Sequence, residues 1–328
     1  MSIRIGIVGY GNLGRGAEYV IAQNKDMELK YLFTRRDPSS INPVTDGVKV
    51  LNINEAKHYT DEIDVMMLCG SSSTDLPVQT PEFAKMFNVV DSYDTHIKVS
   101  EHFSKVDEAA KVGGKIAVMS VGWDPGVFSL NRIMAEAILP QGSTYTFWGE
   151  GISQGHSEVL RRVDGVLDAR QYTVPLKSAL DAARSGDNPE FTSRQTHKRV
   201  CFVVAKEDAN LSAIENEIIN MPYYFADNET VVHFISLDEL KREHSGMPHG
   251  GNVIRSGKTG ADNINNHVIE YGLKIDCNPE FTVSVMTAYA RAAYRLNKEG
   301  SAGCRTIFDI PPYYICAKSP EELRKDYL

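Results

Sequence analysis

Short apolar runs alternate with amphipathic segments along the first 125 residues of the chain. The run Ile5, Ile7 and Val8 predicts a short buried strand, and residues 12–23 carry helix-forming side chains directly after it. The same rhythm predicts further strands at 27–33, 48–51, 64–70, 87–91 and 115–120, and helices near 53–59, 81–87 and 99–112. Strands that alternate with helices are typical of a doubly wound parallel sheet, so we expect an α/β domain of the Rossmann type.

The pattern changes after residue 126, where apolar and polar residues alternate over longer segments. Strands are predicted at 144–151, 168–176, 198–206, 230–236 and 266–276. Such alternation favours one mostly antiparallel open sheet, covered by helices near 178–185 and 280–297. Because 328 residues exceed one ordinary core, we expect two domains, at 1–125 and 126–299. The second would be an α+β domain, and the remaining residues, about 300–328, with a last helix from Ser319, would pack back on the first.

The first strand-to-helix turn is rich in glycine. In the sequence GYGNLG, Gly9 permits a tight turn, Gly11 lets the backbone approach a pyrophosphate, and Gly14 allows the helix to pack closely on the strand. The N-terminus of the following helix would attract the phosphates. Glycines also occur in turns for packing reasons alone, but this position between a strand and a helix favours a dinucleotide site.

The end of the second predicted strand indicates which dinucleotide would bind. An acidic residue at this point is typical of NAD sites, whereas arginine accommodates the 2′-phosphate of NADP. Here the strand is followed by Arg35 and Arg36, two guanidinium groups that can each form bidentate hydrogen bonds with a phosphate. A solvated arginine pair in a surface turn is the alternative, but at this place in the motif we favour NADP.

Polar loops follow the later strands of the predicted sheet, where ligands of such sheets bind. Residues 69–74 form a small-residue loop suited to phosphates and ribose, and the loops 91–96 and 121–126 bring Asp94 and Asp124 towards the same crevice. Both aspartates could instead be helix N-caps, since aspartate is favoured there. We keep that structural interpretation for Asp91 and favour a functional role for Asp94 and Asp124.

The second domain carries a further set of polar candidates. The segment GISQGHSEVLRR combines glycines with Gln154 and His156, and Arg199 begins an otherwise apolar strand. Thr173 lies in the segment QYTVP, and His249 lies in the glycine-rich segment HSGMPHGG, which we expect to be a loop. Taken singly, each residue has an ordinary structural explanation. Together with two carboxylates near a cofactor, they would suit a ligand that bears both ammonium and carboxylate groups.

Composition excludes several classes of function. A net charge of −8 without a basic tract argues against binding to nucleic acids or anionic membranes. No signal peptide and no apolar run long enough to span a bilayer are found. The five cysteines are odd in number and include no C-x-x-C pair, which favours a reducing cytoplasm over a disulfide framework and gives no sign of a metal site.

Several segments together resemble one enzyme family. GYGNLGRG, FTRR, SYDTH, VGWDPG and GISQGHSEVLRRV, with the segments around Thr173, Arg199 and His249, are similar to meso-diaminopimelate dehydrogenase over essentially the whole chain. The resemblance implies NADP-dependent oxidative deamination of the D-centre of meso-2,6-diaminopimelate to L-2-amino-6-oxopimelate and ammonia, within bacterial lysine and cell-wall precursor synthesis. It also implies a homodimer formed through the second domain.

The resemblance also implies roles for individual residues. Cofactor contacts are expected at Gly9, Gly11, Asn12, Leu13, Gly14, Arg35, Arg36, Cys69, Gly70, Ser71, Ser72, Ser92, Tyr93, Asp94, Val121, Gly122, Trp123, Asp124 and Pro125. Substrate contacts are expected at Asp94, Asp124, Trp148, Gln154, Gly155, Thr173, Arg199, His249 and Asn278. The expected catalytic residues Asp94 and Asp124 would face the D-amine. Arg199, Thr173 and His249 would hold the distal carboxylate.

Two other functions are compatible with parts of this pattern. A reductase of the same fold that acts on dihydrodipicolinate or homoserine would share the first domain, but such enzymes lack the segment SQGHS. A non-enzymatic NADP-sensing regulator would need the glycine turn only, without a second domain that carries charged groups towards the nicotinamide. Turnover of an amino acid would exclude the regulator.

Overall fold

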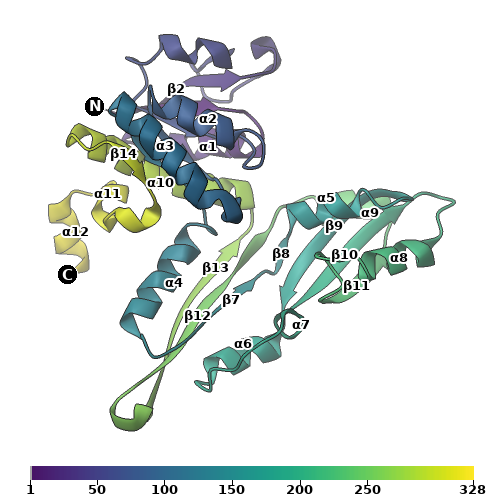
Figure 1. Ribbon diagram of the computed structural model, residues 1–328. Coiled ribbons are helices and arrows are strands. Elements are labelled where there is room, and N and C mark those ends of the chain that lie inside the picture. Colours follow the sequence, from purple (N-terminus) through teal and green to yellow (C-terminus); the bar gives the residue numbers. More distant parts are fainter. Residues whose placement is uncertain (1) are drawn as a thin grey trace. The chain divides into compact units, whose positions relative to one another are not determined.

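The computed structural model describes residues 2–328, which form two compact units (Figure 1). One unit consists of the chain up to Leu130 together with Pro279–Leu328, and the other consists of Asn131–Asn278. The chain therefore leaves the first unit once and later returns to it. The return falls at Pro279, earlier than the boundary near residue 300 that the sequence pattern suggested.

The first unit is built on a parallel sheet of seven strands in the order β14-β6-β5-β4-β1-β2-β3. The strands are β1 (Ile3–Val8), β2 (Met27–Thr34), β3 (Lys49–Asn52), β4 (Val65–Leu68), β5 (Asn88–Asp91), β6 (Ile116–Val118) and β14 (Gly303–Arg305). The order of β1 to β6 is that of a Rossmann sheet, in which the strand order reverses between β1 and β4. The predicted α/β fold is confirmed.

Helices cover both faces of this sheet, and successive strand residues point to opposite faces. Ile5, Ile7 and Met67 lie in the core that contains residues of α1 and α10, whereas Met66 and Leu68 lie in the core that contains residues of α2 and α3. The covering helices are α1 (Asn12–Gln23), α2 (Leu76–Ala84), α3 (Val99–Gly113) and α10 (Asn278–Lys298) (Figure 1). Burial on both faces explains why these strands read as continuous apolar runs.

Helix α10 belongs to the first unit, which corrects one prediction. The helix expected at 280–297 was assigned to the second sheet, yet Met286 and Ala290 are fully buried in the same core as Ile5. Arg291, also buried, donates from Nε to Oδ2 of Asp26 at 2.6 Å and from Nη2 to Oδ1 at 2.7 Å, and these bonds hold the pKa of that carboxyl below its usual value. Helical periodicity predicts an apolar face but does not specify which sheet that face covers.

Smaller elements of the first unit differ from the prediction in three ways. Residues 53–59, expected as a helix, form the 3-10 helix η2 (Ile53–His58). Helix α2 begins at Leu76 instead of near Pro81, because Leu76 and Phe83 are both buried and their packing outweighs the preference of proline for a first turn. Strand β14 was not predicted. The remaining short elements are η1 (Pro38–Ser40), η3 (His96–Lys98), η5 (Ile307–Asp309), α11 (Pro312–Ile315) and α12 (Pro320–Tyr327).

The second unit contains two sheets where the sequence pattern predicted one. Their strand orders are β11-β10-β9-β8 and β13-β12-β7. Pairing is antiparallel except between β10 and β11, which are parallel. The strands are β7 (Gly142–Trp148), β8 (Gly151–Ile152), β9 (Val166–Pro175), β10 (His197–Ala205), β11 (Glu229–Phe234), β12 (His249–Thr259) and β13 (Asn265–Ile275). Alternation predicts single strands, but the division into sheets depends on pairing between distant segments.

The first three residues of β12, His249, Gly250 and Gly251, lie in a segment that was predicted as a loop, and the rest of this strand was not predicted. These glycines are required inside the sheet. A Cβ atom on Gly250 would lie 2.2 Å from the carbonyl oxygen of Leu273, and one on Gly251 would lie 2.1 Å from the carbonyl oxygen of Phe147. The neighbouring strands therefore approach β12 too closely for any side chain at these positions.

Helices pack against each sheet of the second unit. Residues of α5 and α8 share a buried cluster with β9 and β10, and Ala179 and Ala183 of α6 pack on Phe147 and Ile254 of the other sheet. The helices are α4 (Val127–Ile138), α5 (Gln154–Leu160), α6 (Lys177–Arg184), α7 (Ser193–Thr196), α8 (Leu211–Ile219) and α9 (Leu237–Glu243), with the 3-10 helix η4 (Ala261–Asn263). Within residues 2–328, no helix combines the length and apolarity that a membrane crossing requires.

Candidate active site

The glycine turn of the first unit has the geometry of a phosphate-binding turn. Gly9 has a φ of +92°, a conformation that side chains disfavour, and a Cβ atom on Gly14 would lie 2.1 Å from the carbonyl oxygen of Gly9. Gly11 is the N-cap of α1, and within the described residues no heavy atom beyond its chain neighbours lies within 4 Å of the position a Cβ would take. An open backbone at a helix N-terminus fits a pyrophosphate.

This turn opens into a cavity of about 330 Å³ at the carboxyl ends of β1, β2 and β4. Seven of the predicted cofactor residues line it: Gly9, Gly11, Arg35, Arg36, Cys69, Gly70 and Ser71. The other lining residues are Val8, Tyr10, Arg15, Phe33, Thr34, Ile53, Asp75 and Gln79. Four of them lie inside the segments GYGNLGRG and FTRR without having been predicted as contacts, and no motif in the sequence marks Ile53, Asp75 or Gln79.

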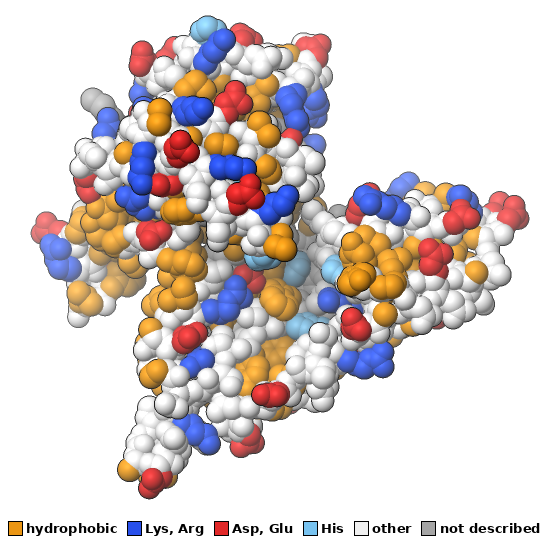
Figure 2. Space-filling model, in the orientation of Figure 1, with side chains coloured by type: hydrophobic (Ala, Val, Ile, Leu, Met, Phe, Trp, Pro, Cys, Tyr) orange, Lys and Arg blue, Asp and Glu red, His pale blue; other side chains and the backbone are white. Residues whose placement is uncertain are grey.

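Three arginines line this cavity, namely Arg15, Arg35 and Arg36, and the last two are each held by a different partner. Arg36 donates from Nη2 to the carbonyl oxygen of Tyr10 at 2.7 Å. Arg35 forms a bidentate ion pair with Asp75, with distances of 2.8 Å from Nη1 to Oδ1 and 3.1 Å from Nη2 to Oδ2. Elsewhere on the first unit, the face visible in Figure 2 intersperses Lys and Arg with Asp and Glu. The cavity thus places cations at a defined point, which suits a phosphate.

Cys69 lines the cavity as a neutral thiol. Its side chain is buried, and burial raises the pKa of the thiol to about 12. The thiolate that would act as a nucleophile is therefore absent at neutral pH. Cys69 therefore helps to shape the cavity without reacting. Its position is fixed by its amide N–H, which donates to the carbonyl oxygen of Val8 at 2.8 Å.

Asp91 joins two strand-end loops, which corrects its predicted role as a helix N-cap. Its fully buried carboxylate accepts hydrogen bonds from the backbone N–H groups of Tyr93 and Ser120, both at 3.0 Å, and from the hydroxyl of Thr80 at 2.7 Å. Ser120 has a φ of +58°, an uncommon conformation for a residue with a side chain. One buried carboxylate thus fixes the loops that lead to Asp94 and to Asp124.

Asp94 and Asp124 lie on the two loops that Asp91 connects. Asp94 is exposed, and its backbone N–H donates to the hydroxyl of Ser72 at 2.9 Å, while Asp124 is half-buried. The 3-10 helix after Asp94 takes Thr95 as its N-cap, so the N-cap alternative does not hold for Asp94. Among the other predicted contacts on these loops, the side chain of Tyr93 is 1 % exposed and lies in the protein core, so only its backbone could meet a cofactor.

The second unit gathers its predicted residues at adjacent strand ends. Thr173 of β9 lies directly opposite Arg199 of β10, and Nη1 of Arg199 donates to the hydroxyl of Thr173 at 2.5 Å. The Nε of Arg199 is buried and has no hydrogen-bond partner within residues 2–328. Burial also lowers the pKa of the guanidinium. A half-buried cation with an unsatisfied donor is a ready site for a ligand carboxylate.

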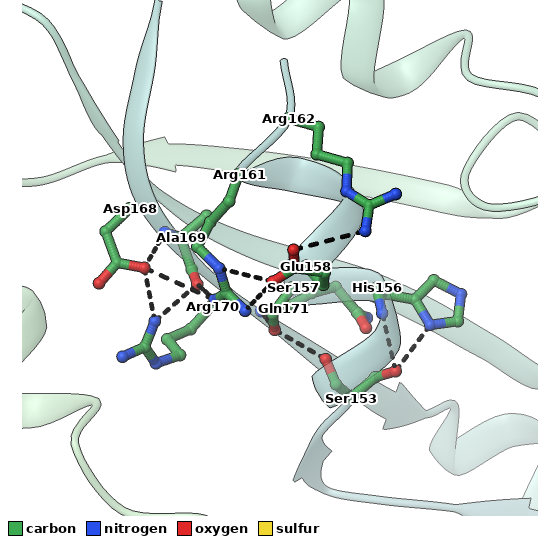
Figure 3. A network of polar contacts seen from close by, with 10 residues as sticks. All are labelled: Ser153, His156, Ser157, Glu158, Arg161, Arg162, Asp168, Ala169, Arg170 and Gln171. Atoms are coloured by element: carbon green, nitrogen blue, oxygen red, sulfur yellow. Dashed lines mark hydrogen bonds and ion pairs between the residues drawn. The ribbon is translucent and has the colours of Figure 1, made fainter. Parts of the chain in front are cut away.

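Helix α5 places Gln154 and Gly155 in its first turn, and a network of polar contacts fixes that helix on β9 (Figure 3). The hydroxyl of Ser157 accepts from the backbone N–H of Gln171 at 2.9 Å and donates to the carbonyl oxygen of Ser153 at 2.7 Å. The selective segment SQGHS is therefore the start of a short helix, and its serines hold it to the sheet.

His197 supports Trp148 and was not identified from the sequence. Its Nε2 accepts the backbone N–H of Trp148 at 2.9 Å, and its ring stacks on the indole with centroids 5.8 Å apart. Burial and the nearby charge of Arg199 lower the pKa of His197 to about 4, and they lower the pKa of His156 to about 4 as well. Both imidazoles are neutral at physiological pH, which leaves Arg199 as the cation of this group.

His249 and Asn278 are the remaining predicted substrate contacts. His249 is the first residue of β12, and a Cβ atom on Gly151 would lie 2.5 Å from its Cα, so β8 and β12 touch here. The backbone N–H of Asn278 donates to the carbonyl oxygen of Met247 at 2.9 Å. The side chain of Gln154 also donates to Met247, at 3.3 Å from Nε2 to the sulfur. Segments far apart in sequence thus meet around residues 247–249.

Comparison with known proteins identifies the family. Residues 122–277 match the model of the diaminopimelic acid dehydrogenase C-terminal domain. Over 99 % of this chain and 98 % of the relative, the sequence is 62 % identical to meso-diaminopimelate D-dehydrogenase of Acetivibrio thermocellus. The chain belongs to the meso-diaminopimelate D-dehydrogenase family. This membership confirms the resemblance that the motifs indicated.

Solved structures of meso-diaminopimelate D-dehydrogenases share the whole fold. A variant of meso-dapdh from Clostridium tetani, solved with DAP, has a TM-score of 0.93 and 51 % identity, with both chains covered completely. Its substitutions include Q154L, T173I, R199M, P248S and H249N, and the residue types that they replaced stand at the same numbers here. An engineered D-amino acid dehydrogenase bound to NADP+ has a TM-score of 0.85 and 43 % identity, also over both complete chains.

Proposed function

We propose that this enzyme catalyses the NADP-dependent oxidative deamination of the D-centre of meso-2,6-diaminopimelate, which yields L-2-amino-6-oxopimelate and ammonia. Family membership supports the reaction, and the engineered relative bound to NADP+ supports the cofactor. The observation that carries the substrate is the half-buried guanidinium of Arg199, whose buried Nε is unsatisfied and whose Nη1 donates to the hydroxyl of Thr173. Such a pair suits the carboxylate of an amino acid.

The residues of the first unit fit NADP. The open backbone at Gly11 would meet the pyrophosphate, and Arg35 and Arg36 would hold the 2′-phosphate. When bound, the nicotinamide supplies the hydride acceptor. Gly70 and Ser71, which line the same cavity, would contact the phosphates or the ribose.

The residues of the second unit would fix the end of the substrate that does not react. Arg199, Thr173 and His249 would hold the carboxylate of the L-centre, and Asn278 would contact the L-amine. Trp148, Gln154 and Gly155 would form the walls of the substrate site. Holding this end presents the Cα–H of the D-centre, and not that of the L-centre, to the nicotinamide, because a misaligned hydrogen is a poor hydride donor.

The carboxylates of Asp94 and Asp124 would act at the D-amine. The amine must lose a proton before the Cα–H bond breaks, since only a free nitrogen lone pair can form the C=N bond of the imine. Either carboxylate would accept a hydrogen bond from the ammonium and direct its proton towards water. Water then adds to the imine carbon, and ammonia leaves.

The proposal includes a homodimer and a cytoplasmic location. Family resemblance implies the dimer, and α4 exposes the apolar side chains of Ile133, Met134 and Ile138, with exposed fractions of 49 %, 52 % and 63 %. Exposed apolar groups in a row are typical of an interaction face. All five cysteines are free thiols, which fits a reducing compartment.

The decisive experiment is a spectrophotometric assay for reduced nicotinamide. Purified enzyme receives NADP and, in separate reactions, the meso, LL and DD isomers of diaminopimelate, with NAD as the cofactor control. We expect turnover with the meso isomer and NADP. Absence of turnover with every isomer would contradict the proposed reaction.

A further inference from the structure

The cofactor cavity contains a carboxylate close to where phosphates are expected. Asp75 precedes α2, and its side chain is 13 % exposed. Its Oδ2 accepts the backbone N–H of Ser71 at 3.0 Å, so the carboxylate is fixed to the loop after β4. Arg35, in contrast, is 66 % exposed and extends from the end of β2. The acid is therefore the anchored partner of the ion pair, and the guanidinium is the partner that can move.

In its ion pair with Asp75, Arg35 uses the same N–H donors that would bind a phosphate. Both terminal nitrogens of Arg35 lie on Asp75, at 2.8 Å and 3.1 Å from its two oxygens. This bidentate geometry is the one in which arginine binds phosphates. Arg36 is held differently, because it donates to the carbonyl oxygen of Tyr10 and keeps its charge uncompensated by that contact. The two arginines are thus not equivalent before a ligand arrives.

We propose that Asp75 is a specificity-determining residue for the cofactor, because its carboxylate competes with the 2′-phosphate of NADP for Arg35. This inference rests on the proposed use of NADP. NADP must displace Asp75 from Arg35, or bind beside an uncompensated carboxylate, whereas NAD leaves the ion pair intact. Asp75 therefore lowers the preference for NADP below the value that two arginines alone would give. It also favours release of NADPH, because the ion pair re-forms as the phosphate leaves.

Binding of adenosine fragments isolates this effect from catalysis. Isothermal titration calorimetry compares adenosine 2′,5′-bisphosphate with 5′-AMP, which lacks the 2′-phosphate. Asp75→Asn keeps the shape and an oxygen for the N–H of Ser71 but removes the charge. Because an exposed ion pair is weak, we expect the bisphosphate to bind about five times more tightly to this variant. Binding of 5′-AMP should change less than about twofold, and added salt should shrink the gain.

Three matched variants separate competition from other effects. Glu82→Gln removes the same charge from an exposed position on α2 and should leave both affinities unchanged. Asp75→Ser, which keeps a side chain favoured at a helix N-terminus, should reproduce the gain. With Arg35→Met already present, Asp75→Asn should lose most of its effect, as a double-mutant cycle would measure. Circular dichroism and thermal unfolding check that each variant is folded.

Several outcomes would overturn the inference. Weaker binding of the bisphosphate to Asp75→Asn would mean that the carboxylate orients Arg35 for the phosphate instead of competing with it. If Asp75→Asn changed the affinities for both nucleotides equally, the effect would come from overall charge and not from competition for Arg35. The same would follow if Glu82→Gln raised the affinity for the bisphosphate as much as Asp75→Asn does. Failure of the proposed reaction is a separate result, because it leaves nucleotide binding measurable. Absence of a preference for the bisphosphate in the unmodified protein would contradict the NADP assignment itself.

Discussion

At the scale of single residues, the second unit places one charged arginine beside two neutral histidines. Arg199 carries the positive charge, and His156 and His197 beside it are neutral because burial and that charge lower their pKa values to about 4. Thr173 satisfies one donor of Arg199 and leaves Nε for a ligand. The arrangement suits an anion, because Arg199 is charged while the two histidines beside it are neutral at physiological pH.

Replacing Arg199 with Met tests this assignment. The variant removes the cation but keeps an apolar stem, so we expect KM for meso-diaminopimelate to rise by about tenfold or more, as loss of a charged hydrogen-bond partner predicts. Simple D-amino acids without a distal carboxylate should be less affected, so specificity relaxes towards them. Steady-state kinetics with both substrates measure the ratio. Unchanged kinetics with meso-diaminopimelate would contradict the role of Arg199.

The depressed pKa of His197 predicts a pH dependence of stability. The unfolded chain binds a proton near pH 6.5, but the folded protein does not until about pH 4. Unfolding therefore takes up a proton in this window, and the stabilisation is complete above pH 6.5 and is lost as pH falls towards 4. In His197→Gln, the free energy of unfolding should fall less steeply over this range, by up to about 1.4 kcal/mol per pH unit.

Urea denaturation at several pH values measures this difference. His58→Gln, at an exposed position, is the control for loss of a histidine elsewhere. If the wild-type protein and His197→Gln lose stability in parallel between pH 6.5 and 4, the buried neutral imidazole does not account for the effect.

At the scale of elements, the loops after β5 and β6 depend on Asp91. Its carboxylate is the acceptor for the N–H groups of Tyr93 and Ser120, and the carbonyl oxygen of Asp91 accepts the N–H of Val121 at 2.9 Å. Neither loop has regular secondary structure to satisfy these donors. The positions of Asp94 and Asp124 thus follow from a buried side chain that touches neither a substrate nor a cofactor in the proposed mechanism.

Replacing Asp91 with Ala should affect both stability and activity. One buried and one partly buried N–H group would lose their acceptor, which costs roughly 3 kcal/mol in the free energy of unfolding. Because both loops lose their anchor, we also expect kcat to fall about tenfold or more. Asp91→Asn keeps one side-chain oxygen that can accept these hydrogen bonds, so it should retain much of the stability and much of kcat. Chemical denaturation and steady-state kinetics provide the test, and equal behaviour of the two variants would contradict the anchoring role.

At the scale of the whole molecule, the apolar face of α4 predicts self-association. Ile133, Met134 and Ile138 are three large apolar side chains exposed on this one helix. Met134→Glu places a charge within this face and should convert the proposed dimer to a monomer, whereas Glu136→Gln on the same helix should not. Light scattering coupled to size-exclusion chromatography measures the mass. A dimer that Met134→Glu leaves intact would exclude α4 as the interface.

Local rules were enough to predict several elements from the sequence. The parallel Rossmann sheet followed from apolar runs at helix and strand periods, and the phosphate-binding turn followed from the spacing of Gly9, Gly11 and Gly14. Only glycine suits the positive φ of Gly9 and the close approach at Gly14, whereas Gly11 leaves the backbone open. The residue types of the proposed substrate site were also evident, since Arg199 interrupts an apolar strand and the SQGHS segment is distinctive. Their roles in the reaction stay predictions.

Which distant segments meet could be learned only from the folded chain. The sheet that α10 covers, the division of the second unit into two sheets, and the place of β12 all depend on pairing and packing across long stretches of chain. The same holds for Asp91, which bonds to Ser120, and for Asp75, which lies 40 residues from Arg35 in sequence. Periodicity reports the faces of a single element, whereas these contacts depend on the close packing of many elements at once, which no local pattern encodes.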